Sequence, residues 1–510
     1  MGPVRAVTAV GTMVVLAVGA LSATQGRSNA VRAPEGRVVV GYASAADLTA
    51  ALSAGHAVVV RRLAPLHVAE LRATDPGALR HVPGIRFVQR PAARVSADVA
   101  PAVSLALSAA SGSAWEWQYA AIGEAAVPDA VLRAASSVRI AVIDTGADLA
   151  APDLAAKSPH AYNTRTGTAD VRDENGHGTF VASLAAGSVT VGDGIAGSGG
   201  DAQLLIVKSG SSSGAFTDMD EAAGIIYAVD HGARIINLSV GGPATSTTER
   251  RAIGYAVQHG VLVVAAVGNE HTAGNPVEYP AALLQPAGSN GVGGDGLAVG
   301  ASTQTGARAF FSNTGSWVSL AAPGENVFGD VSQLSSPLLY PRTALPGSQA
   351  GLYGYGSGTS FAAPQVAGAA ALVWAANPSL TAQQVAAILK ATASGAGHWT
   401  PELGFGVIDV AAAVARAQAG AAGVLLSGDR VANRVHLTWQ GDASAYTLSL
   451  TIDAHAPRLV LTATPLTTTS LTLPRGHAYS FTVAALDAAG SPAATSVPLT
   501  FSVPAVRSRG

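Results

Sequence analysis

Between residues 114 and 418, short apolar stretches rich in β-branched residues alternate with stretches that have a helical pattern. A strand that is apolar along its whole length is buried on both faces, and strands joined through helices pair in parallel. We therefore predict an α/β fold with a doubly wound, mostly parallel sheet covered by helices. The strand-like stretches are VRIAVID, AQLLIVKS, ARIINLSV, GVLVVAAVG and DGLAVGAS, and the helix-like stretches are GTFVASLAAG, DEAAGIIYAVDHG and SFAAPQVAGAAALVWAAN.

Two smaller units flank this domain. Residues 36–95 contain the apolar stretches RVVVGYA, AVVVRRL and GIRFVQR, separated by the helix-like AADLTAALSAG and LHVAELRATDPGALRHV. This order predicts a small α+β unit of strand–helix–strand–helix–strand type, and the Ala/Ser-rich residues 96–113 predict a linker. Residues 424–505 contain short stretches of alternating hydrophobicity broken by Gly, Pro and Asp, which predict an all-β sandwich.

Residues 1–30 have the order of a signal peptide, with Arg5, then an apolar run from Val7 to Leu21, then small and polar residues. The apolar run is short and interrupted for a membrane span, which favours a cleaved leader over a single N-terminal anchor. No later stretch of the sequence reaches membrane length. We therefore expect a secreted, extracellular protein with no membrane association after signal removal.

The composition excludes several classes of function. The formal net charge is −2, so no excess of positive charge attracts nucleic acid or an anionic membrane surface. The chain has no cysteine, which excludes thiol catalysis, cysteine-ligated zinc and disulfide bonds. A secreted form of this chain must therefore be stabilised by its core or by bound ions.

Three polar residues stand where predicted strands end or helices begin. Asp144 ends the strand VRIAVID, His177 stands between two glycines in DENGHGTF, and Ser360 follows Gly-Thr in GSGTSFAAP. Functional residues of α/β sheets gather at such junctions. A carboxylate that orients an imidazole, which in turn removes the proton of a serine, creates a nucleophile that attacks carbonyl groups. Because proline fits the first turn of a helix, Pro364 places Ser360 at or just before a helix N-terminus.

A fourth junction adds an amide. The stretch GVLVVAAVGNEH leaves a buried strand at Gly268, and the side chain of Asn269 can donate a hydrogen bond to the oxyanion of a tetrahedral intermediate. The backbone N–H of Ser360, at the positive end of its helix, can donate beside it. Taken singly, such residues also serve as helix N-caps, loop histidines or turn residues. Four of them at four glycine-rich junctions favour the catalytic interpretation.

The motifs DTG, GHGT, GN and GTSFAAPQVAG, in this order, resemble those of the subtilisin-like serine proteases, or subtilases. The resemblance implies hydrolysis of peptide bonds at the carboxyl edge of the sheet, with Asp144, His177 and Ser360 as the triad and Asn269 in the oxyanion hole. The matching NLSVGG implies a pocket for the residue before the scissile bond, beside which an extended peptide can add as a strand. One wall of this pocket is then Ser239, Val240 and Gly241, and the other is Ala266, Val267 and Gly268.

The flanking units fit the same resemblance. Residues 36–95 resemble the subtilase propeptide, a folding chaperone and intramolecular inhibitor, so self-cleavage is expected between Val95 and Ser113. Residues 424–505 resemble a fibronectin type III domain, with Trp439 on one core strand and Tyr479 on another. The expected partners are protein or peptide substrates and the chain's own propeptide.

Four positions depart from the common family pattern. Phe180 stands where the family often has a second histidine, and Ser183 where glycine is usual. Phe361 and Gln365 stand where methionine and histidine are commonest. None of these changes removes a catalytic atom, so we expect them to affect packing and pocket shape.

Two other functions compete with this interpretation. The stretch GSSSG follows a strand and fits a nucleophile elbow, which would make Ser212 the nucleophile of a serine esterase. Its serine run is explained more simply as a surface loop. A non-catalytic binding protein on a subtilase fold is the other alternative, and the presence of all four catalytic residues argues against it.

The chemistry requires no cofactor. The resemblance allows a structural calcium ion, because calcium sites are common in the family. The acidic run Asp170–Glu174 offers oxygen atoms for such an ion but has no recognisable ligand spacing, so we assign no metal ligand.

Overall fold

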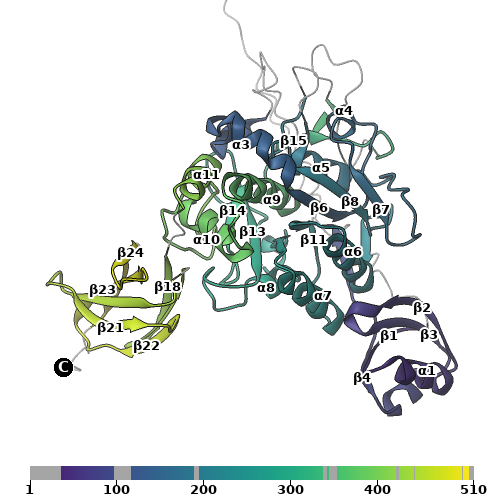
Figure 1. The fold of residues 1–510 in the computed structure, drawn as a ribbon, viewed down its shortest axis with the longest axis horizontal. Coiled ribbons are helices and arrows are strands. Elements are labelled where there is room, and N and C mark those ends of the chain that lie inside the picture. The colour runs from purple at the N-terminus through teal and green to yellow at the C-terminus, as the bar shows by residue number, and fades with distance from the viewer. Residues whose placement is uncertain are drawn as a thin grey trace, which may run out of the picture.

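The computed structural model describes residues 36–96, 116–188, 194–336, 340, 342–343, 353–420, 424–441, 443–496 and 498–504. Its largest domain is built on a seven-stranded sheet in which all neighbouring strands are parallel (Figure 1). The α/β prediction is confirmed, and each of the five predicted strands is present. From edge to edge the strands are β14 (Leu320–Pro323), β13 (Gly296–Ser302), β12 (Leu262–Ala266), β10 (Ile235–Leu238), β6 (Arg139–Asp144), β8 (Gln203–Lys208) and β7 (His160–Asn163).

Helices cover both faces of this sheet, as the apolar strands require. The three predicted helices are present as α5, α6 and α9. One face packs against α5 (His177–Ala186), α9 (Thr359–Ala376), α10 (Ala382–Thr392) and α11 (Val410–Gln418), and the other against α6 (Asp218–Asp230), α7 (Thr247–Gln258) and α8 (Ala281–Leu284).

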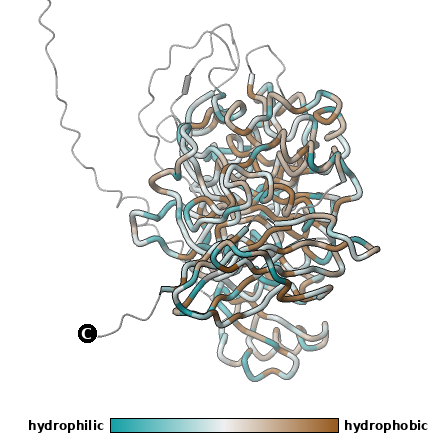
Figure 2. Tube along the Cα trace, turned by 90° about the vertical axis from the view of Figure 1, so that its left-hand side faces the viewer, coloured by the Kyte–Doolittle hydropathy of each residue, from teal (hydrophilic) through white to brown (hydrophobic). Residues whose placement is uncertain are grey.

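Helix α9 crosses the middle of the domain and is buried from Thr359 to Trp374. Small residues allow this close packing, since a Cβ at Gly368 would lie 2.5 Å from the carbonyl carbon of Ser198. Figure 2 shows hydrophobic segments running through the interior of the molecule. The burial of α9 on all sides fixes the position of its first turn, which carries Ser360.

The N-terminal unit is a four-stranded antiparallel sheet with one α-helix. The prediction of a second helix was wrong, because LHVAELRATDPGALRHV forms β3 and only a short 3₁₀ turn, η2. Strand β3 pairs with a neighbour on each side, and its Glu70 accepts a hydrogen bond from Arg37 at 2.9 Å, so long-range pairing outweighs local helical preference. The elements are β1 (Arg37–Tyr42), α1 (Ala45–Ala54), β2 (Ala57–Leu63), η1 (Ala64–Leu66), β3 (Val68–Ala73), η2 (Ala78–His81) and β4 (Ile85–Gln89).

One face of this sheet packs on α6 and α7 of the large domain (Figure 1). Apolar side chains such as Val39 and Val68 join the core beneath these helices. Polar contacts support the packing, with Arg61 paired to Asp220 at 2.9 Å and Arg251 donating to the backbone oxygen of Leu66 at 2.9 Å. The N-terminal unit is therefore docked on the large domain through both apolar and charged contacts.

The C-terminal unit consists of two antiparallel sheets around a core of its own, which includes Trp439, Tyr446 and Phe481. The predicted all-β architecture is confirmed. The strands are β18 (Leu425–Val431), β19 (Arg434–Gln440), β20 (Tyr446–Ile452), β21 (Arg458–Thr464), β22 (Thr468–Thr472), β23 (His477–Leu486), β24 (Pro492–Thr495) and β25 (Leu499–Val503).

The predicted signal peptide and nearly all of the predicted linker lie outside the described residues. Within the described ranges, none of the helices combines the length and apolar character needed to span a bilayer. Strand β5 (Ala93–Ser96) follows the N-terminal sheet in the chain. Shorter elements complete the large domain, namely α2 (Trp117–Ala121), α3 (Asp129–Ala134), α4 (Pro152–Ala155), β9 (Ala215–Thr217), β11 (Val240–Gly241), β15 (Val327–Asp330), β16 (Arg342–Thr343) and β17 (Tyr353–Gly356).

Candidate active site

Asp144 is the last residue of β6, and the turn that follows requires glycine at position 146. Gly146 has a φ of +127°, and a Cβ there would lie 2.2 Å from the backbone oxygen of Val171. The Asp144 side chain is buried, and its Oδ1 accepts a hydrogen bond from the backbone N–H of Thr145 at 2.7 Å. The strand and its turn therefore fix a carboxylate in surroundings shielded from water.

His177 is the first residue of α5, and its Nδ1 lies 2.7 Å from Oδ1 of Asp144. The close approach depends on glycine, because a Cβ at Gly178 would lie 2.2 Å from the backbone oxygen of Gly146. Burial raises the pKa of Asp144, and attraction to His177 and its hydrogen bond oppose that rise. An ionised Asp144 keeps the proton of the neutral imidazole on Nδ1, so that Nε2 can exchange a proton with a substrate-facing group.

Ser360 is the second residue of α9, so its predicted place at a helix N-terminus is confirmed. The reason given from the sequence was wrong, since Pro364 lies inside the helix, beyond its first turn. Proline has no N–H to donate to the backbone oxygen four residues earlier, which is that of Ser360. The hydroxyl of Ser239 donates to this oxygen instead, at 2.7 Å, and itself accepts from Nδ2 of Asn237 at 2.9 Å.

Asn269 follows β12, and its amide is held in one orientation by Thr359. Its Oδ1 accepts hydrogen bonds from the backbone N–H and from the hydroxyl of Thr359, both at 2.9 Å. The same hydroxyl accepts from the N–H of Gly268 at 3.2 Å. Because Oδ1 faces Thr359, the Nδ2 group of the same amide points away from Thr359. The residue before Ser360 thus orients the predicted oxyanion donor.

Aromatic packing brings the start of α9 to the imidazole. The ring of Phe361, next to Ser360, lies 5.6 Å from the His177 ring between centroids, and 4.4 Å from the ring of Phe180. Tyr340 closes the cluster, 5.9 Å from Phe180. The two phenylalanines that depart from the family pattern therefore pack on each other beside the histidine.

The two polar departures also have structural partners. Gln365 donates through Nε2 to the backbone oxygens of Pro323 and Phe361, both at 2.7 Å. Ser183 donates to the backbone oxygen of Phe180 at 2.8 Å and accepts from the N–H of Asp330 at 3.0 Å. All four departures thus contribute to packing around the site, as expected.

The six predicted pocket residues occupy the ends of two adjacent strands. Strands β10 and β12 pair in parallel, so the segments that leave their carboxyl ends lie side by side. All six residues are buried, and none carries a charge. They are Ser239, Val240 and Gly241 after β10, and Ala266, Val267 and Gly268 at the end of β12.

Strand β5, from the N-terminal part of the chain, lies along this pocket. It pairs antiparallel with β9 on one side and with β11 on the other, and the N–H of Ser96 donates to the backbone oxygen of Gly214 at 2.9 Å. In the register with β11, Val95 faces Gly241 and Ser96 faces Val240. The strand position predicted for an extended peptide is therefore occupied by the chain itself.

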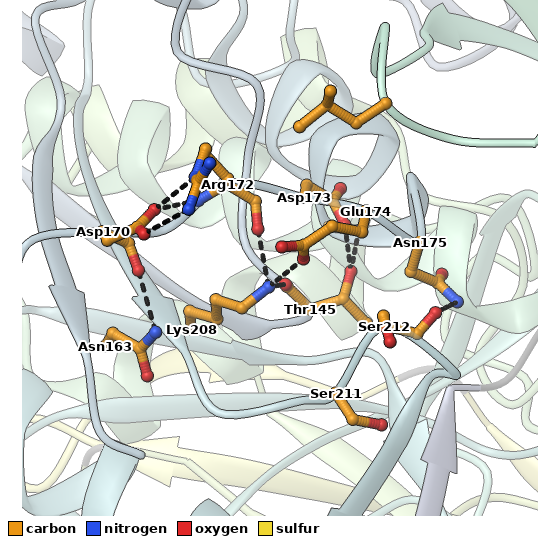
Figure 3. A network of polar contacts seen from close by, with 12 residues as sticks. Thr145, Asn163, Asp170, Arg172, Asp173, Glu174, Asn175, Lys208, Ser211 and Ser212 are labelled. Carbon is orange, nitrogen blue, oxygen red and sulfur yellow. Dashed lines mark hydrogen bonds and ion pairs between the residues drawn. The ribbon is translucent and has the colours of Figure 1, made fainter. Parts of the chain in front are cut away.

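The acidic run beside the site is used in internal contacts (Figure 3). Asp170 pairs with Arg172 at 2.9 Å, and Glu174 pairs with Lys208 at 2.8 Å. Asp173 accepts hydrogen bonds from two backbone N–H groups and two hydroxyls around the start of α5. Within the part of the chain that the structure describes, no three or more His, Cys, Asp or Glu side chains form a group that could hold a metal ion.

Ser212 lies in the loop between β8 and β9, with its side chain exposed. Its backbone oxygen accepts from Nδ2 of Asn175 at 3.2 Å (Figure 3), and Oδ1 of Asn175 accepts from the N–H of His177 at 3.2 Å. Asn175 thereby connects this loop to the start of α5. The arrangement agrees with a surface loop that borders the site.

A doubly wound parallel sheet that carries a buried aspartate–histidine pair, an oriented asparagine and a serine on a buried helix has the architecture of a subtilisin-like serine peptidase. The chain belongs to the subtilase family, whose model (Peptidase_S8, Subtilase family) matches residues 135–406.

The chain is similar to known bacterial proteases over this region. It is 37% identical over 243 residues to the thermophilic serine proteinase of Bacillus sp. (strain AK1), a match that covers 48% of this chain and 53% of that protein. It is 36% identical over 278 residues to subtilisin Savinase of Lederbergia lenta, covering 54% of this chain and 91% of the relative. The chain thus spans about half the length of the first relative.

Solved structures share the fold. The crystal structure of fervidolysin from Fervidobacterium pennivorans, described as a keratinolytic enzyme related to subtilisin, matches with a TM-score of 0.64 and 21% identity. This match covers 89% of the chain and 87% of fervidolysin. At 21% identity, this match shows a shared fold and nothing further.

Proposed function

We propose that the protein is a secreted serine endopeptidase that hydrolyses peptide bonds through Asp144, His177 and Ser360. The observation that carries this proposal is the 2.7 Å contact between the buried Asp144 and His177, at the edge of the sheet where α9 presents Ser360. Membership of the subtilase family and similarity to proteases over the same residues support it.

The reaction follows from the roles of these groups. Ser360 Oγ attacks the scissile carbonyl carbon while His177 Nε2 takes the hydroxyl proton, and Asp144 stabilises the imidazolium that forms. Nδ2 of Asn269 and the N–H of Ser360 donate to the oxyanion. His177 then gives the proton to the leaving amine, which leaves an acyl-enzyme. Water, activated in the same way, hydrolyses this ester and restores Ser360.

The N-terminal unit acts as an inhibitory propeptide in this proposal. Strand β5 lies between β9 and β11, the position that a substrate strand would take, and pairs with Val240 and Gly241 of one predicted pocket wall. The bond cleaved in maturation lies between Val95 and Ser113, a stretch that is mostly outside the described residues. Residues 1–30 act as the secretion signal, and the C-terminal β-sandwich is of fibronectin type III type, with no part in the chemistry.

Substitution of the nucleophile tests the proposal. Ser360→Ala should abolish hydrolysis of a protein substrate such as casein and should leave the secreted chain at its unprocessed length. Ser212→Ala is the matched control, because this serine is exposed in a loop near the site and should be dispensable for both events. Hydrolysis is measured by the release of soluble peptides, and chain length by mass spectrometry. Full activity of the Ser360 variant, or loss of activity only in the Ser212 variant, would overturn the proposal.

A further inference from the structure

Arg94 of β5 is buried completely, although it is a long charged side chain. Its side chain is 0% exposed, as are those of its two ion-pair partners, Glu221 and Glu249. Buried charges are rare in proteins unless they are paired, because removing them from water is costly. A strand that is held by backbone pairing does not need such an arginine, so the pocket around Arg94 requires a separate explanation.

The contacts match the shape of a guanidinium group. Nε and Nη2 of Arg94 both donate to Oε1 of Glu249, at 3.0 and 2.5 Å, and Nε lies 3.4 Å from Oε2 of Glu221. Nη1 donates to the backbone oxygen of Ala93 at 2.9 Å. A Cβ at Gly242 would lie 3.2 Å from Nη1, so glycine at 242 leaves room for the side chain. Lysine offers a single charged nitrogen and cannot make this set of contacts.

The acids of this pocket belong to the large domain and stay there when β5 leaves. Glu221 and Glu249 lie in the first turns of α6 and α7, where the helix dipoles favour negative charge. Burial and repulsion from Glu249 raise the pKa of Glu221, and attraction to Arg94 opposes that rise. A guanidinium bound between the two carboxyl groups therefore favours their charged forms.

We propose that this pocket selects arginine in substrates, four residues before the cleaved bond, an inference that rests on the endopeptidase function proposed above. Strand β5 is held between β9 and β11 through its backbone, so another peptide can take its place in the same register. A substrate with arginine at the position of Arg94 then places the third residue after it opposite Ser239. The hydroxyl of Ser239 contacts the backbone of Ser360 at 2.7 Å, so the bond after that residue is the one attacked.

The proposal is tested by measuring how fast the self-processed wild-type enzyme cleaves three chromogenic peptides. One has the sequence of residues 94–97, and the other two each differ from it at one position. They are acetyl-Arg-Val-Ser-Ala-p-nitroanilide and the same compound with citrulline or alanine in place of arginine. Citrulline keeps the shape of arginine and lacks its charge. We expect kcat/KM to be at least about 30-fold higher for arginine than for citrulline, as for a buried charge pair that loses one partner. Equal values would overturn the inference.

Position and partner are tested separately. Successive side chains of a strand point to opposite faces. The kcat/KM of acetyl-Ala-Arg-Ser-Ala-p-nitroanilide should therefore be no higher than that of acetyl-Ala-Ala-Ser-Ala-p-nitroanilide. Glu249→Gln should lower the arginine-to-citrulline ratio of kcat/KM towards one. Asp129→Asn, which changes an exposed acid on α3, is the matched control and should keep the wild-type ratio. A gain from arginine at the shifted position, or an unchanged ratio in the Glu249 variant, would contradict the inference.

The two proposals fail in different ways. If the alanine and arginine peptides are cleaved at equal rates by an activity that Ser360→Ala removes, the enzyme is an endopeptidase without arginine selection. If the enzyme cleaves neither these peptides nor casein, the endopeptidase function is refuted, and the arginine pocket is refuted as a substrate site with it.

Discussion

The hydrogen bond from Ser239 to the backbone oxygen of Ser360 should contribute to stability only because Pro364 leaves that oxygen without a helical donor. Ser239→Ala removes the hydroxyl that donates to the buried oxygen of Ser360. Pro364→Ala supplies an N–H at the position from which an α-helix donates to the same oxygen. The two substitutions should therefore be coupled, with the second relieving part of the cost of the first.

The magnitude follows from the two bonds that Ser239 makes. Ser239→Ala leaves both the oxygen of Ser360 and Nδ2 of Asn237 without these partners, and each buried unsatisfied group costs about 1–3 kcal/mol. We expect a total loss of about 2–6 kcal/mol in the free energy of unfolding. With alanine at 364 only the Asn237 group is affected, so the coupling free energy should be about 1–3 kcal/mol.

The assay is equilibrium unfolding in urea of the four members of this double-mutant cycle. All four carry Ser360→Ala, which prevents self-digestion and keeps the backbone oxygen in question. The free energy of unfolding is obtained from the midpoint and slope of each transition, and an unchanged slope shows that the native and unfolded states are comparable. If Ser239→Ala lowers the free energy of unfolding equally with proline and with alanine at 364, the Ser239 hydroxyl does not replace a missing helical donor at the oxygen of Ser360, and the reasoning is refuted.

Three further predictions concern the site and a buried acid. Asn269→Ala should lower kcat by about 10²–10³ with little change in KM, and an unchanged kcat in steady-state assays would remove Asn269 from the oxyanion hole. Activity should rise between about pH 5 and 8 as His177 loses its proton, and a flat pH profile of kcat/KM would argue against its role as base. Glu116 is a buried acid directly before α2, and it accepts a hydrogen bond from the N–H of Ala196 at 3.0 Å. Burial raises the pKa of Glu116 to about 8 in the folded state, so its stabilising contribution is complete below the unfolded-state pKa of about 4.5 and is lost as the pH rises towards 8. Relative to Glu116→Gln, the wild type should therefore lose about 4 kcal/mol of unfolding free energy between pH 4.5 and pH 8, and parallel stability curves would refute this.

The sheet and the places of the four candidate catalytic residues at its edge could be predicted because each depends on a short stretch of sequence. Apolar β-branched strands are buried wherever they occur, and the polar residue that ends such a strand lies at the edge of the sheet. The glycines around Asp144 and His177 carry a second signal, since the backbones approach too closely there for any side chain. Such features can be predicted because distant parts of the chain do not change them.

The errors arose where a distant partner decides the local structure. The stretch VAELRA can form a helix by its residue preferences, and pairing with strands on both sides makes it β3. Pro364 is disfavoured inside an isolated helix, and the hydroxyl of Ser239, 121 residues away from Ser360 in the chain, makes it tolerable by supplying the missing donor. Neither partner can be identified from the neighbouring sequence.

The arginine pocket was missed for the same reason, and its composition bears on maturation. Glu249 lies 155 residues after Arg94, and an acid in the first turn of a helix is common enough to draw no attention by itself. In the proposed function the cleaved propeptide still carries Arg94, so it remains bound through the same carboxylates that would hold a substrate arginine. Substrates with arginine at this position should therefore compete with the propeptide more effectively than others. Selectivity for arginine and release from inhibition then depend on one pocket.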